Sequence, residues 1–327
     1  MIISRTPLRL SFFGGGTDYP DYFLRHGGAI LGSAIGKYSF ITANRFPSKL
    51  FDYSLRVSYR KVELVKDIGE VEHRVYRECL KYCGLESDIE LHNIADLPAF
   101  TGLGSSSSFT VGLLKVLYAF KGQSLSAQEL GYRAIEMEQQ ILQEHVGCQD
   151  QMLAAVGGLN LIEFHQLDDI RVTPVHLSAE RLRELESHLM LLFTKITRRA
   201  DEVASDQLRQ LDKNLDTLRR MRAMVDEGLA LLTGSGDLRA FGRLLHESWM
   251  LKHQLSDRIT TPAINALYQR GLDHGAIGGK LLGAGGGGFI MFFVPPDQQT
   301  ALRNAFPDFE IIDVSLAAPG ASIIFES

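Results

Sequence analysis

A run of glycine and hydroxyl residues stands directly before an apolar segment near the end of the first third of the chain. The run Gly-Leu-Gly-Ser-Ser-Ser-Ser at 102–108 is followed by Phe109–Phe120, which is long and apolar enough for a buried helix. Glycine lets backbone N–H groups turn toward an anion, and a helix N-terminus adds positive dipole there. The hydroxyls can cap the helix, bind phosphate oxygens or contact Mg²⁺. We expect a polyphosphate ligand. The alternative is a serine-rich cap without a ligand, and the run is not a Walker A loop.

The composition is that of an ordinary globular protein. The 327 residues are enough for two domains or one large one, and the net charge of −5 argues against nucleic acid or an anionic membrane as the main partner. No apolar run reaches transmembrane length, and the first residues show no signal-peptide pattern, so we expect a cytoplasmic protein. Cys79 and Cys83 could be half of a metal site, but no second pair completes it. They and Cys148 are expected to be core thiols.

Strand and helix patterns follow one another irregularly in the first half of the chain. Strands are predicted at Ile2–Phe13, Ala29–Ile35, Tyr38–Asn44, Leu55–Ser58, Ile89–His92 and Gly158–Phe164. Helices are predicted at Glu72–Cys83, Ser107–Phe120 and Ala127–Gln143. Because a regular βαβ alternation is missing, we expect an α+β fold and not a doubly wound sheet.

The second half changes character. Leucine, methionine and valine recur every three or four residues from Leu208 to Leu229, which predicts a long amphipathic helix. Further helices are predicted over 238–255 and from Thr261. Strands are predicted at Phe289–Val294, Glu310–Val314 and Ser322–Phe325. We place the domain boundary near residues 168–174, which gives domains of residues 1–170 and 171–327.

Two more glycine-rich segments lie at the ends of the chain, at 14–16 and 278–288. Residues 283–288 fit the pattern G-x-G-x-x-G, but the dinucleotide fingerprint must follow the first strand and open a helix. This segment instead leads into a predicted strand near the C-terminus, so we reject that function. Four consecutive glycines favour close backbone approach to a ligand or to another loop over a plain turn.

The three segments, in this order, resemble the motifs of the GHMP kinases, a family that includes galactokinase and mevalonate kinase. The first is Pro7-Leu8-Arg9 with 14–18, the second is 98–107, and the third is 282–289. The resemblance extends over nearly the whole chain. It implies a two-domain GHMP kinase architecture, with an N-terminal α+β domain, a ferredoxin-like C-terminal domain and ATP-dependent phosphoryl transfer between them. It assigns ATP binding to Gly102, Leu103, Gly104, Ser105, Ser106, Ser107 and Ser108.

Within the family the chain is most similar to kinases of D-glycero-α-D-manno-heptose 7-phosphate. The strings at 10–18, 149–151, 246–249 and 278–289 carry this similarity. It implies phosphorylation of the anomeric C1 hydroxyl to the 1,7-bisphosphate, in the synthesis of nucleotide-activated heptose. Two alternatives remain: an anomeric kinase for an unphosphorylated sugar such as L-fucose, and a catalytically silent regulator that binds sugar or nucleotide. The sequence does not determine the oligomeric state.

The resemblance assigns catalysis to Asp150 and Arg9. Asp150 resembles the catalytic aspartate of galactokinases and mevalonate kinases, and would accept or orient the proton of the acceptor hydroxyl. The alternative is the N-cap of a short helix. Arg9 matches the basic residue of the first motif, where it would keep Asp150 ionised and offset charge on the transferred phosphoryl group. An outward-facing strand arginine is the alternative.

The metal ligands expected from the family are Ser106 and Glu138, which would hold Mg²⁺ between the β- and γ-phosphates. Glu136 and Glu144 lie nearby in the sequence, and a glutamate on such a helix can also be a solvated surface residue. We choose Glu138 over Glu136.

The expected substrate-binding residues are Thr17, Asp18, Gly285, Gly286 and Arg198. Asp18 matches a carboxylate that holds sugar hydroxyls in related kinases, although an aspartate there can also cap a turn. Galactokinases carry Glu-His where this chain has Gly15-Gly16, and the loss of both side chains favours a larger or phosphorylated sugar. Arg198 would hold the far phosphate, with Lys252 and Lys280 as further candidates.

Overall fold

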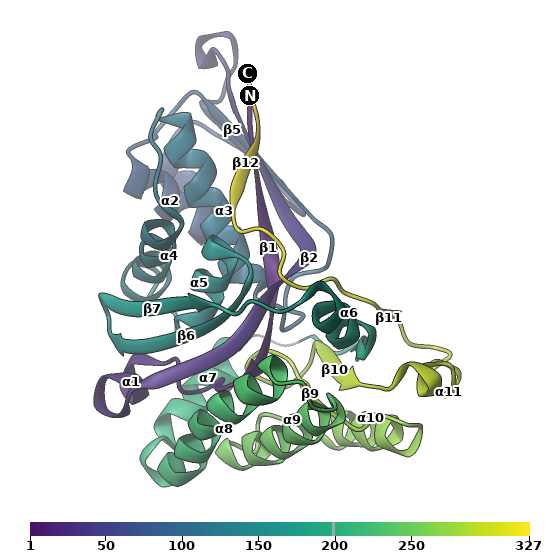
Figure 1. The fold of residues 1–327 in the computed structure, drawn as a ribbon. Coiled ribbons are helices and arrows are strands. Elements are labelled where there is room, and N and C mark those ends of the chain that lie inside the picture. Colours follow the sequence, from purple (N-terminus) through teal and green to yellow (C-terminus); the bar gives the residue numbers. More distant parts are fainter. Residues whose placement is uncertain (198–199) are drawn as a thin grey trace.

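The computed structural model describes residues 1–197 and 200–327 and contains two β-sheets (Figure 1). The first sheet has eight strands. Six follow the order β12-β1-β2-β5-β3-β4, and β6 and β7 extend from β2. Its strands are β1 (Ile2–Phe13), β2 (Gly28–Arg45), β3 (Leu55–Ser58), β4 (Val62–Val65), β5 (Ile89–Ala95), β6 (Leu159–Gln166), β7 (Asp169–Pro174) and β12 (Ser322–Glu326). The accompanying helices are α1 (Pro20–His26), α2 (Arg74–Cys83), α3 (Ser105–Phe120), α4 (Ala127–Glu136) and α5 (Gln149–Val156).

The long strand β2 organises this sheet. Its first half pairs with β6 and its second half with β5, while β1 runs antiparallel along its other edge. The two strands predicted over this region are one strand. Gly36 and Lys37 bulge out of the ladder between the Leu8–Ile35 and Pro7–Tyr38 pairs, and a bulge does not end a strand.

The two halves of β1 differ in how many of their residues are buried. Ile2 to Arg5 alternate between buried and partly exposed, whereas every residue from Thr6 to Phe13 is buried. The second half of the strand is covered on both faces, because the other half of the molecule packs against it. This brings Arg9 to a buried position at the junction of the two halves.

The second sheet is antiparallel throughout, in the order β11-β8-β10-β9. Its strands are β8 (Leu189–Phe193), β9 (Gly278–Leu281), β10 (Phe289–Phe293) and β11 (Ile311–Ile312). Numbered by chain order this is 4-1-3-2, the ferredoxin-like arrangement. The helices of this half are α6 (Ala179–Ser187), α7 (Ala200–Arg209), α8 (Leu215–Thr233), α9 (Arg239–Lys252), α10 (Pro262–Asp273) and α11 (Gln299–Ala305). Figure 1 shows α8, α9 and α10 as a layer beneath the sheets.

Two predicted helices are divided in the structure. A 3₁₀ turn at Asp212–Asn214 separates α7 from α8, and the Asn214 side chain donates a 2.8 Å hydrogen bond to the carbonyl of Leu255. The helix predicted over 127–143 ends at Glu136 and continues as a π-helical turn, Met137–Ile141. At the first break, a hydrogen bond to a residue distant in sequence holds the backbone, and hydrophobic spacing reveals neither break.

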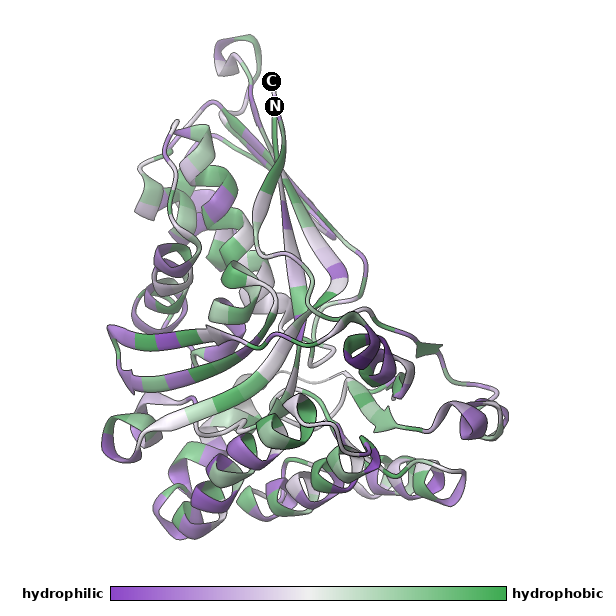
Figure 2. Ribbon diagram, viewed as in Figure 1, coloured by the Kyte–Doolittle hydropathy of each residue, from purple (hydrophilic) through white to green (hydrophobic). Residues whose placement is uncertain are grey.

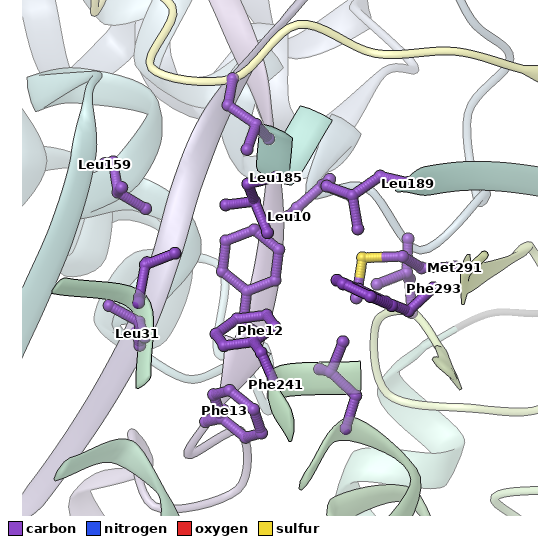
Figure 3. Packing of buried hydrophobic residues seen from close by; sticks show 14 of the residues in the cluster. Leu10, Phe12, Phe13, Leu31, Leu159, Leu185, Leu189, Phe241, Met291 and Phe293 are labelled. Carbon is purple, nitrogen blue, oxygen red and sulfur yellow. The ribbon is translucent and has the colours of Figure 1, made fainter. Parts of the chain in front are cut away.

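One hydrophobic cluster joins the two sheets (Figure 3). Phe241 of α9 packs edge-on against Phe12 and Phe13 of β1, with ring centroids 5.5 and 5.1 Å apart. Met291 and Phe293 of β10 belong to the same cluster. Figure 2 shows apolar residues on the strands inside the molecule and polar ones along the outer helices. The two halves therefore share a core, which fixes the space between them.

The chain returns to the first sheet at its end, where β12 pairs with β1. The division predicted at residue 170 falls inside β7, which pairs with β6. The structure therefore places residues 171–174 and 322–326 with the first sheet. The three cysteines are buried and free. Among the described residues, no helix combines the length and apolar character needed to cross a membrane.

Candidate active site

A cleft opens where the two halves meet, and it brings together residues from all three glycine segments. Its lining comes from the second half of β1 and the loop after it, and from the start of α3 and the 145–150 segment. Residues of α9, β9 and the C-terminal glycine loop also line it. The residues that line it include Arg9, Ser11, Gly15, Gly16, Asp18, Gly102, Gly104, Ser105, Ser106, Ser107, His145, Gln149, Asp150, Lys252, Lys280, Gly283 and Gly285.

Arg9 and Asp150 form a bidentate ion pair in this cleft. The Arg9 Nε and Nη2 atoms donate to the two Asp150 carboxylate oxygens at 2.7 and 2.6 Å. The side chain of Arg9 is 5% exposed and that of Asp150 is 24% exposed. Arg9 is therefore not an outward-facing strand residue. Asp150 lies in the first turn of α5, one residue after it begins, and the N-cap residue is Cys148. This pair holds one carboxylate in a fixed orientation while leaving it accessible from the cleft.

The second glycine segment forms the N-terminus of α3. Gly102 and Gly104 have φ values of +80° and +72°, and Gly104 is the N-cap of the helix. Gly104 has no side chain to cap the first N–H groups, so they remain available to an anion in the cleft. The carbonyl of Gly102 accepts a 2.7 Å hydrogen bond from Arg9. The proposed ATP loop is thus tied directly to the ion pair.

Five of the seven residues predicted to bind ATP line the cleft, and two do not. Leu103 is fully buried in the cluster that joins the sheets, and Ser108 is buried with its hydroxyl donating to the Thr6 carbonyl at 3.3 Å. Their side chains point into the core and anchor the loop there, so they do not face the cleft. We therefore correct the assignment of these two side chains from ligand contact to loop support.

The C-terminal glycine loop packs against the second glycine segment. A Cβ atom on Gly283 would lie 2.7 Å from the Gly102 Cα atom, and one on Gly288 would lie 2.3 Å from the Thr101 carbonyl oxygen. Gly285 lines the cleft, whereas the Gly286 N–H donates to the Ile259 carbonyl at 2.8 Å. The expectation of close approach to another loop is confirmed. The loop leads into the strand β10 and not into a helix, so it is not a dinucleotide fingerprint.

Asp18 is buried beside Asp150, whereas Thr17 is turned away from the cleft. The Asp18 carboxylate accepts hydrogen bonds from the N–H groups of Gly16 and Gln149, at 3.0 and 3.4 Å. Burial, and then the charge of Asp150, raise the pKa of Asp18. The Thr17 hydroxyl is fully buried and bonds the carbonyls of Gly14 and Ala29. We correct the role of Thr17 from substrate contact to support of the turn that presents Asp18.

Glu138 lies just behind the cleft, and Ser107 connects it to the cleft wall. Its Oε2 atom accepts hydrogen bonds from Ser107 Oγ at 2.8 Å and from Gln151 Nε2 at 2.5 Å. Its Oε1 atom is buried without a hydrogen-bond partner. Burial raises the pKa of Glu138 to about 7. Ser106 is exposed in the cleft and does not bond Glu138, whereas its neighbour Ser107 does.

These oxygen atoms fit a magnesium ion. Mg²⁺ in such sites is held by one or two protein oxygens together with water and substrate phosphates. An orphaned carboxylate oxygen on Glu138 and the hydroxyls of Ser106 and Ser107 supply hard ligands near the proposed phosphate site. No cluster of three or more histidine, cysteine or acidic side chains suited to a metal occurs among the described residues. A magnesium ion held by these oxygens would complete its coordination with water and nucleotide phosphates.

Two buried lysines complete the cleft. Lys252 of α9 donates to the Gly283 carbonyl, and Lys280 of β9 donates to the Phe12 carbonyl at 3.0 Å. Burial lowers the pKa of Lys252 to about 8 and lowers that of Lys280 further below its usual range. The sequence offered these lysines only as further candidates, because single lysines give no sign of burial. Arg198, the residue preferred there, lies outside the described residues.

Sequence patterns did not reveal three polar residues near the ion pair and Glu138. Ser11 and Gln149 line the cleft, and Gln151 holds Glu138. Ser11 stands two residues after Arg9 on the same face of β1, so strand periodicity could have found it once Arg9 was assigned. The contacts of Gln149 and Gln151 depend on how α5 docks, which no local pattern encodes.

Comparison with known proteins defines the class. A model of the GHMP kinase N-terminal domain matches residues 70–158, and one of the GHMP kinase C-terminal domain matches residues 221–311. A curated protein of Campylobacter jejuni, named D-glycero-alpha-D-manno-heptose 7-phosphate kinase, is 30% identical over 93% of this chain and 92% of its own length. The chain belongs to the GHMP kinase family, and it is a phosphotransferase of the sugar-kinase type.

Other relatives agree with this class. An L-fucokinase/L-fucose-1-P guanylyltransferase of Bacteroides fragilis is 28% identical over 93% of this chain and 35% of its own length. Among solved structures, a D-glycero-D-manno-heptose 1-phosphate kinase from Bacteroides thetaiotaomicron has a TM-score of 0.81, with 24% identity over both whole chains. A putative sugar kinase from Campylobacter jejuni has a TM-score of 0.74, with 26% identity over 98% of this chain and 97% of that one. The two solved structures share the two-domain GHMP kinase fold with this chain.

Proposed function

We propose that this sugar kinase transfers the γ-phosphoryl group of ATP to the C1 hydroxyl of D-glycero-α-D-manno-heptose 7-phosphate and forms the 1,7-bisphosphate. The observation that carries the proposal is the Asp150 carboxylate, fixed by Arg9 between the N-terminus of α3 and Asp18. In this proposal the phosphate donor binds at the N-terminus of α3, and the sugar hydroxyls bind at Asp18. The Campylobacter relative supports the identity of the sugar.

The residues divide the work of phosphoryl transfer. The first-turn N–H groups of α3 and the hydroxyls of Ser105 and Ser106 bind the phosphates of ATP. Asp150 orients the C1 hydroxyl and accepts its proton as the new C1–O–P bond forms and the bond from phosphorus to the ADP oxygen breaks. Arg9 holds Asp150 and faces the transferred group. Mg²⁺, held by Ser106 and Glu138 when bound, would neutralise phosphate charge.

Space beside Asp18 supports a sugar larger than galactose. A Cβ atom on Gly15 would meet only Ser11 Oγ at 3.8 Å and Gln149 Nε2 at 3.9 Å, which are ordinary contact distances. The missing side chain therefore leaves room in the cleft next to Asp18 and Gln149. The free, buried thiols and the use of ATP support an enzyme of the cytoplasm.

A second candidate is an anomeric kinase for L-fucose, which the Bacteroides fragilis relative favours. An assay coupled to ADP release, with heptose 7-phosphate, the unphosphorylated heptose, L-fucose and galactose, separates the two. We expect the highest kcat/KM with heptose 7-phosphate, and a product whose new phosphorus NMR signal couples to the C1 proton. Efficient turnover of L-fucose alone would contradict the proposal, and a phosphate on another carbon would contradict the assigned position.

A further inference from the structure

Lys252 and Arg9 are joined through the backbones of two glycine loops. The Lys252 ammonium group donates to the carbonyl of Gly283, in the C-terminal glycine loop. Gly283 packs directly on Gly102, because a Cβ atom on Gly283 would lie 2.7 Å from the Gly102 Cα atom. The Gly102 carbonyl in turn accepts a 2.7 Å hydrogen bond from Arg9 Nη1. A continuous series of contacts therefore connects the two cations through the loop that precedes α3, the proposed phosphate site.

The charged groups around Lys252 place it near the ion pair. Lys252 lines the same cleft as Arg9, Asp18 and Asp150. Burial, and then the charge of Arg9, lower the pKa of Lys252, whereas the charges of Asp18 and Asp150 raise it. Interactions between charges weaken with distance and with screening by solvent. Because all three groups act on Lys252, its ammonium group lies close to the carboxylate that is proposed to accept the proton.

Packing fixes the position of the helix that carries Lys252. Phe241, near the start of α9, packs edge-on against Phe12 of β1. Trp249, one turn before Lys252, is fully buried. Lys252 itself is the last residue of α9 and is 6% exposed. A cation that is already held in place needs little reorganisation when negative charge develops beside it.

Lys252 carries its positive charge at neutral pH. Its pKa is about 8, so the ammonium form predominates at pH 7. Lys280 lines the same cleft, but burial, and then the charge of Lys252, lower its pKa well below the usual range. Lys252 is therefore the more basic of the two lysines. An ammonium group has three donors, and the contact with Gly283 uses one of them.

We propose that Lys252 binds the transferred phosphoryl group, as a second cation beside Arg9, and stabilises the negative charge of its oxygens in the transition state. This inference rests on the proposed function for the reaction but not for the identity of the sugar. The hydroxyl proton still passes to Asp150 as the C1–O–P bond forms and the bond from phosphorus to the ADP oxygen breaks, so Lys252 stays protonated throughout. Fixed cations of this kind lower the barrier to phosphoryl transfer.

The first test compares nucleotides with and without a γ-phosphate. The probes are MgADP and the magnesium complex of AMPPNP, an ATP analogue whose γ-phosphate is not transferred, and calorimetry measures both without sugar. We expect Lys252→Met to bind the AMPPNP complex about 10- to 100-fold more weakly, the cost of a hydrogen bond to a charged group, and MgADP within about threefold of wild type. Lys213→Met, at an exposed position before α8, is the matched control and should change neither affinity.

Gly283→Ala separates this role from a purely structural one, in which Lys252 only holds the C-terminal glycine loop. A side chain on Gly283 meets Gly102 and displaces the loop before α3, so this variant should bind both nucleotides more weakly. If Lys252→Met behaves in the same way and loses affinity equally for both nucleotides, the proposal is wrong and Lys252 is a loop anchor. No loss for either nucleotide would also overturn it.

Turnover gives a second readout. We expect Lys252→Met to lower kcat by about 10²–10³, the usual cost of removing one fixed donor to the transition state, and Lys252→Arg to retain more activity because it keeps the charge. An equal kcat in wild type and Lys252→Met would contradict the proposal.

The pH dependence of kcat/KM tests the charge of Lys252 directly. The charged and titratable groups around it are Arg9, Asp18, Asp150, Lys280 and His253. In wild type, kcat/KM should fall as pH rises through about 8, because the free enzyme then loses the Lys252 proton. Lys252→Arg should show no such fall up to about pH 10, where arginine stays protonated. An unchanged profile in Lys252→Arg would contradict the proposal.

Failure of the sugar assignment is a separate result. It would appear as poor turnover of heptose 7-phosphate by the wild-type enzyme. The calorimetric test contains no sugar, so its outcome does not depend on which sugar the enzyme phosphorylates.

Discussion

At the scale of single residues, the geometry assigns the main chemical work to one carboxylate. Asp150 receives two hydrogen bonds from Arg9 and keeps a face open to the cleft. An anomeric hydroxyl must lose its proton as the bond to phosphorus forms, and Asp150 is in position to receive it. The orientation of the carboxylate comes from β1 and its location from α5, two elements far apart in the sequence.

Replacement of Asp150 by asparagine should separate proton transfer from substrate binding. Asp150→Asn preserves the shape of the side chain but cannot accept the proton, so we expect kcat to fall by about 10²–10⁴ while ATP affinity changes little. Circular dichroism should show an unchanged fold, because the exchange is nearly isosteric. A near wild-type rate would mean that catalysis rests on positioning and on charge from Arg9 and Mg²⁺.

The predicted Mg²⁺ ligands can be tested by a double-mutant cycle. If Ser106 and Glu138 bind one ion, Ser106→Ala and Glu138→Gln remove much of the same contribution. The double variant should then be less impaired in kcat than the two single losses combined. The measurement is kcat over a range of Mg²⁺ concentrations. Coupling of Glu138 with Ser107→Ala instead, and additivity with Ser106→Ala, would move the hydroxyl ligand to Ser107, which bonds Glu138 in the structure.

The burial of Lys252 should lower the free energy of unfolding of the protein. Burial lowers its pKa to about 8, so between pH 8 and its ordinary value of 10.5 the unfolded chain binds more protons than the folded one. Stability therefore rises with pH in that window, and the cost is fully present below pH 8. Arg9, Asp18 and Asp150 are the charged groups that act on it.

We accordingly expect Lys252→Met to raise the free energy of unfolding at pH 7 by about 1–3 kcal/mol, and this gain should shrink toward pH 10.5. Urea unfolding at several pH values measures it, with Lys213→Met as the control. A loss of stability at pH 7 would show that the nearby carboxylates outweigh the cost of burial.

At the scale of elements, the two glycine loops form a single support for the phosphate site. Gly283 and Gly102 touch through their backbones, and both have positive φ values. A side chain on Gly283 would push the loop before α3 out of place. The effect should appear in nucleotide binding, because the N-terminus of α3 is the proposed phosphate site.

Gly283→Ala and Gly122→Ala form a matched pair for this test. Their φ values are +73° and +68°, so both substitutions carry a similar backbone cost of about 1–2 kcal/mol. A Cβ atom on Gly122 meets nothing within 4 Å, whereas one on Gly283 meets Gly102. We expect Gly122→Ala to show the loss in melting temperature of the backbone cost alone, and Gly283→Ala to show a larger loss together with a rise in the KM for ATP of at least about tenfold. Equal KM values for ATP in the two variants would show that the C-terminal glycine loop is an ordinary turn that does not support the phosphate site.

At the scale of the whole molecule, the first and last strands close the sheet that carries Arg9. β12 pairs with the outer edge of β1 from Ile2 to Arg5, and the Met1 ammonium group donates to the Ser327 carbonyl at 3.2 Å. Removal of β12 leaves β1 as an edge strand with unpaired backbone groups.

Deletion of residues 322–327 should therefore lower the free energy of unfolding by about 2–4 kcal/mol, at roughly 1 kcal/mol for each lost ladder hydrogen bond. Urea unfolding measures the loss. Ile324→Ser is the control, because Ile324 is 47% exposed and its replacement leaves the ladder in place. An unchanged midpoint for the deletion would show that the shared core alone holds β1.

The amino-acid sequence by itself determined several of the secondary-structure elements and the family of this protein. The apolar run Phe109–Phe120 became α3, and the glycines and serines before it form its N-terminus, because conformational freedom and capping are properties of neighbouring residues. The order of three glycine segments indicated the family, and the family assigned Arg9, Asp150, Asp18 and Glu138 to a common site. The structure brings these four together at or directly behind the cleft.

Tertiary structure decided which side of each motif faces the ligand. Ser107 and not Ser106 bonds Glu138, Thr17 supports a turn, and Leu103 and Ser108 anchor a loop. Adjacent residues share the same local sequence signal, and only packing against distant elements separates them. Lys252 and Lys280 show this most clearly, because each lysine becomes a buried residue of the cleft only when α9 and β9 pack beside the end of β1. Burial depends on what the rest of the chain places around a residue, and short-range patterns do not contain that information.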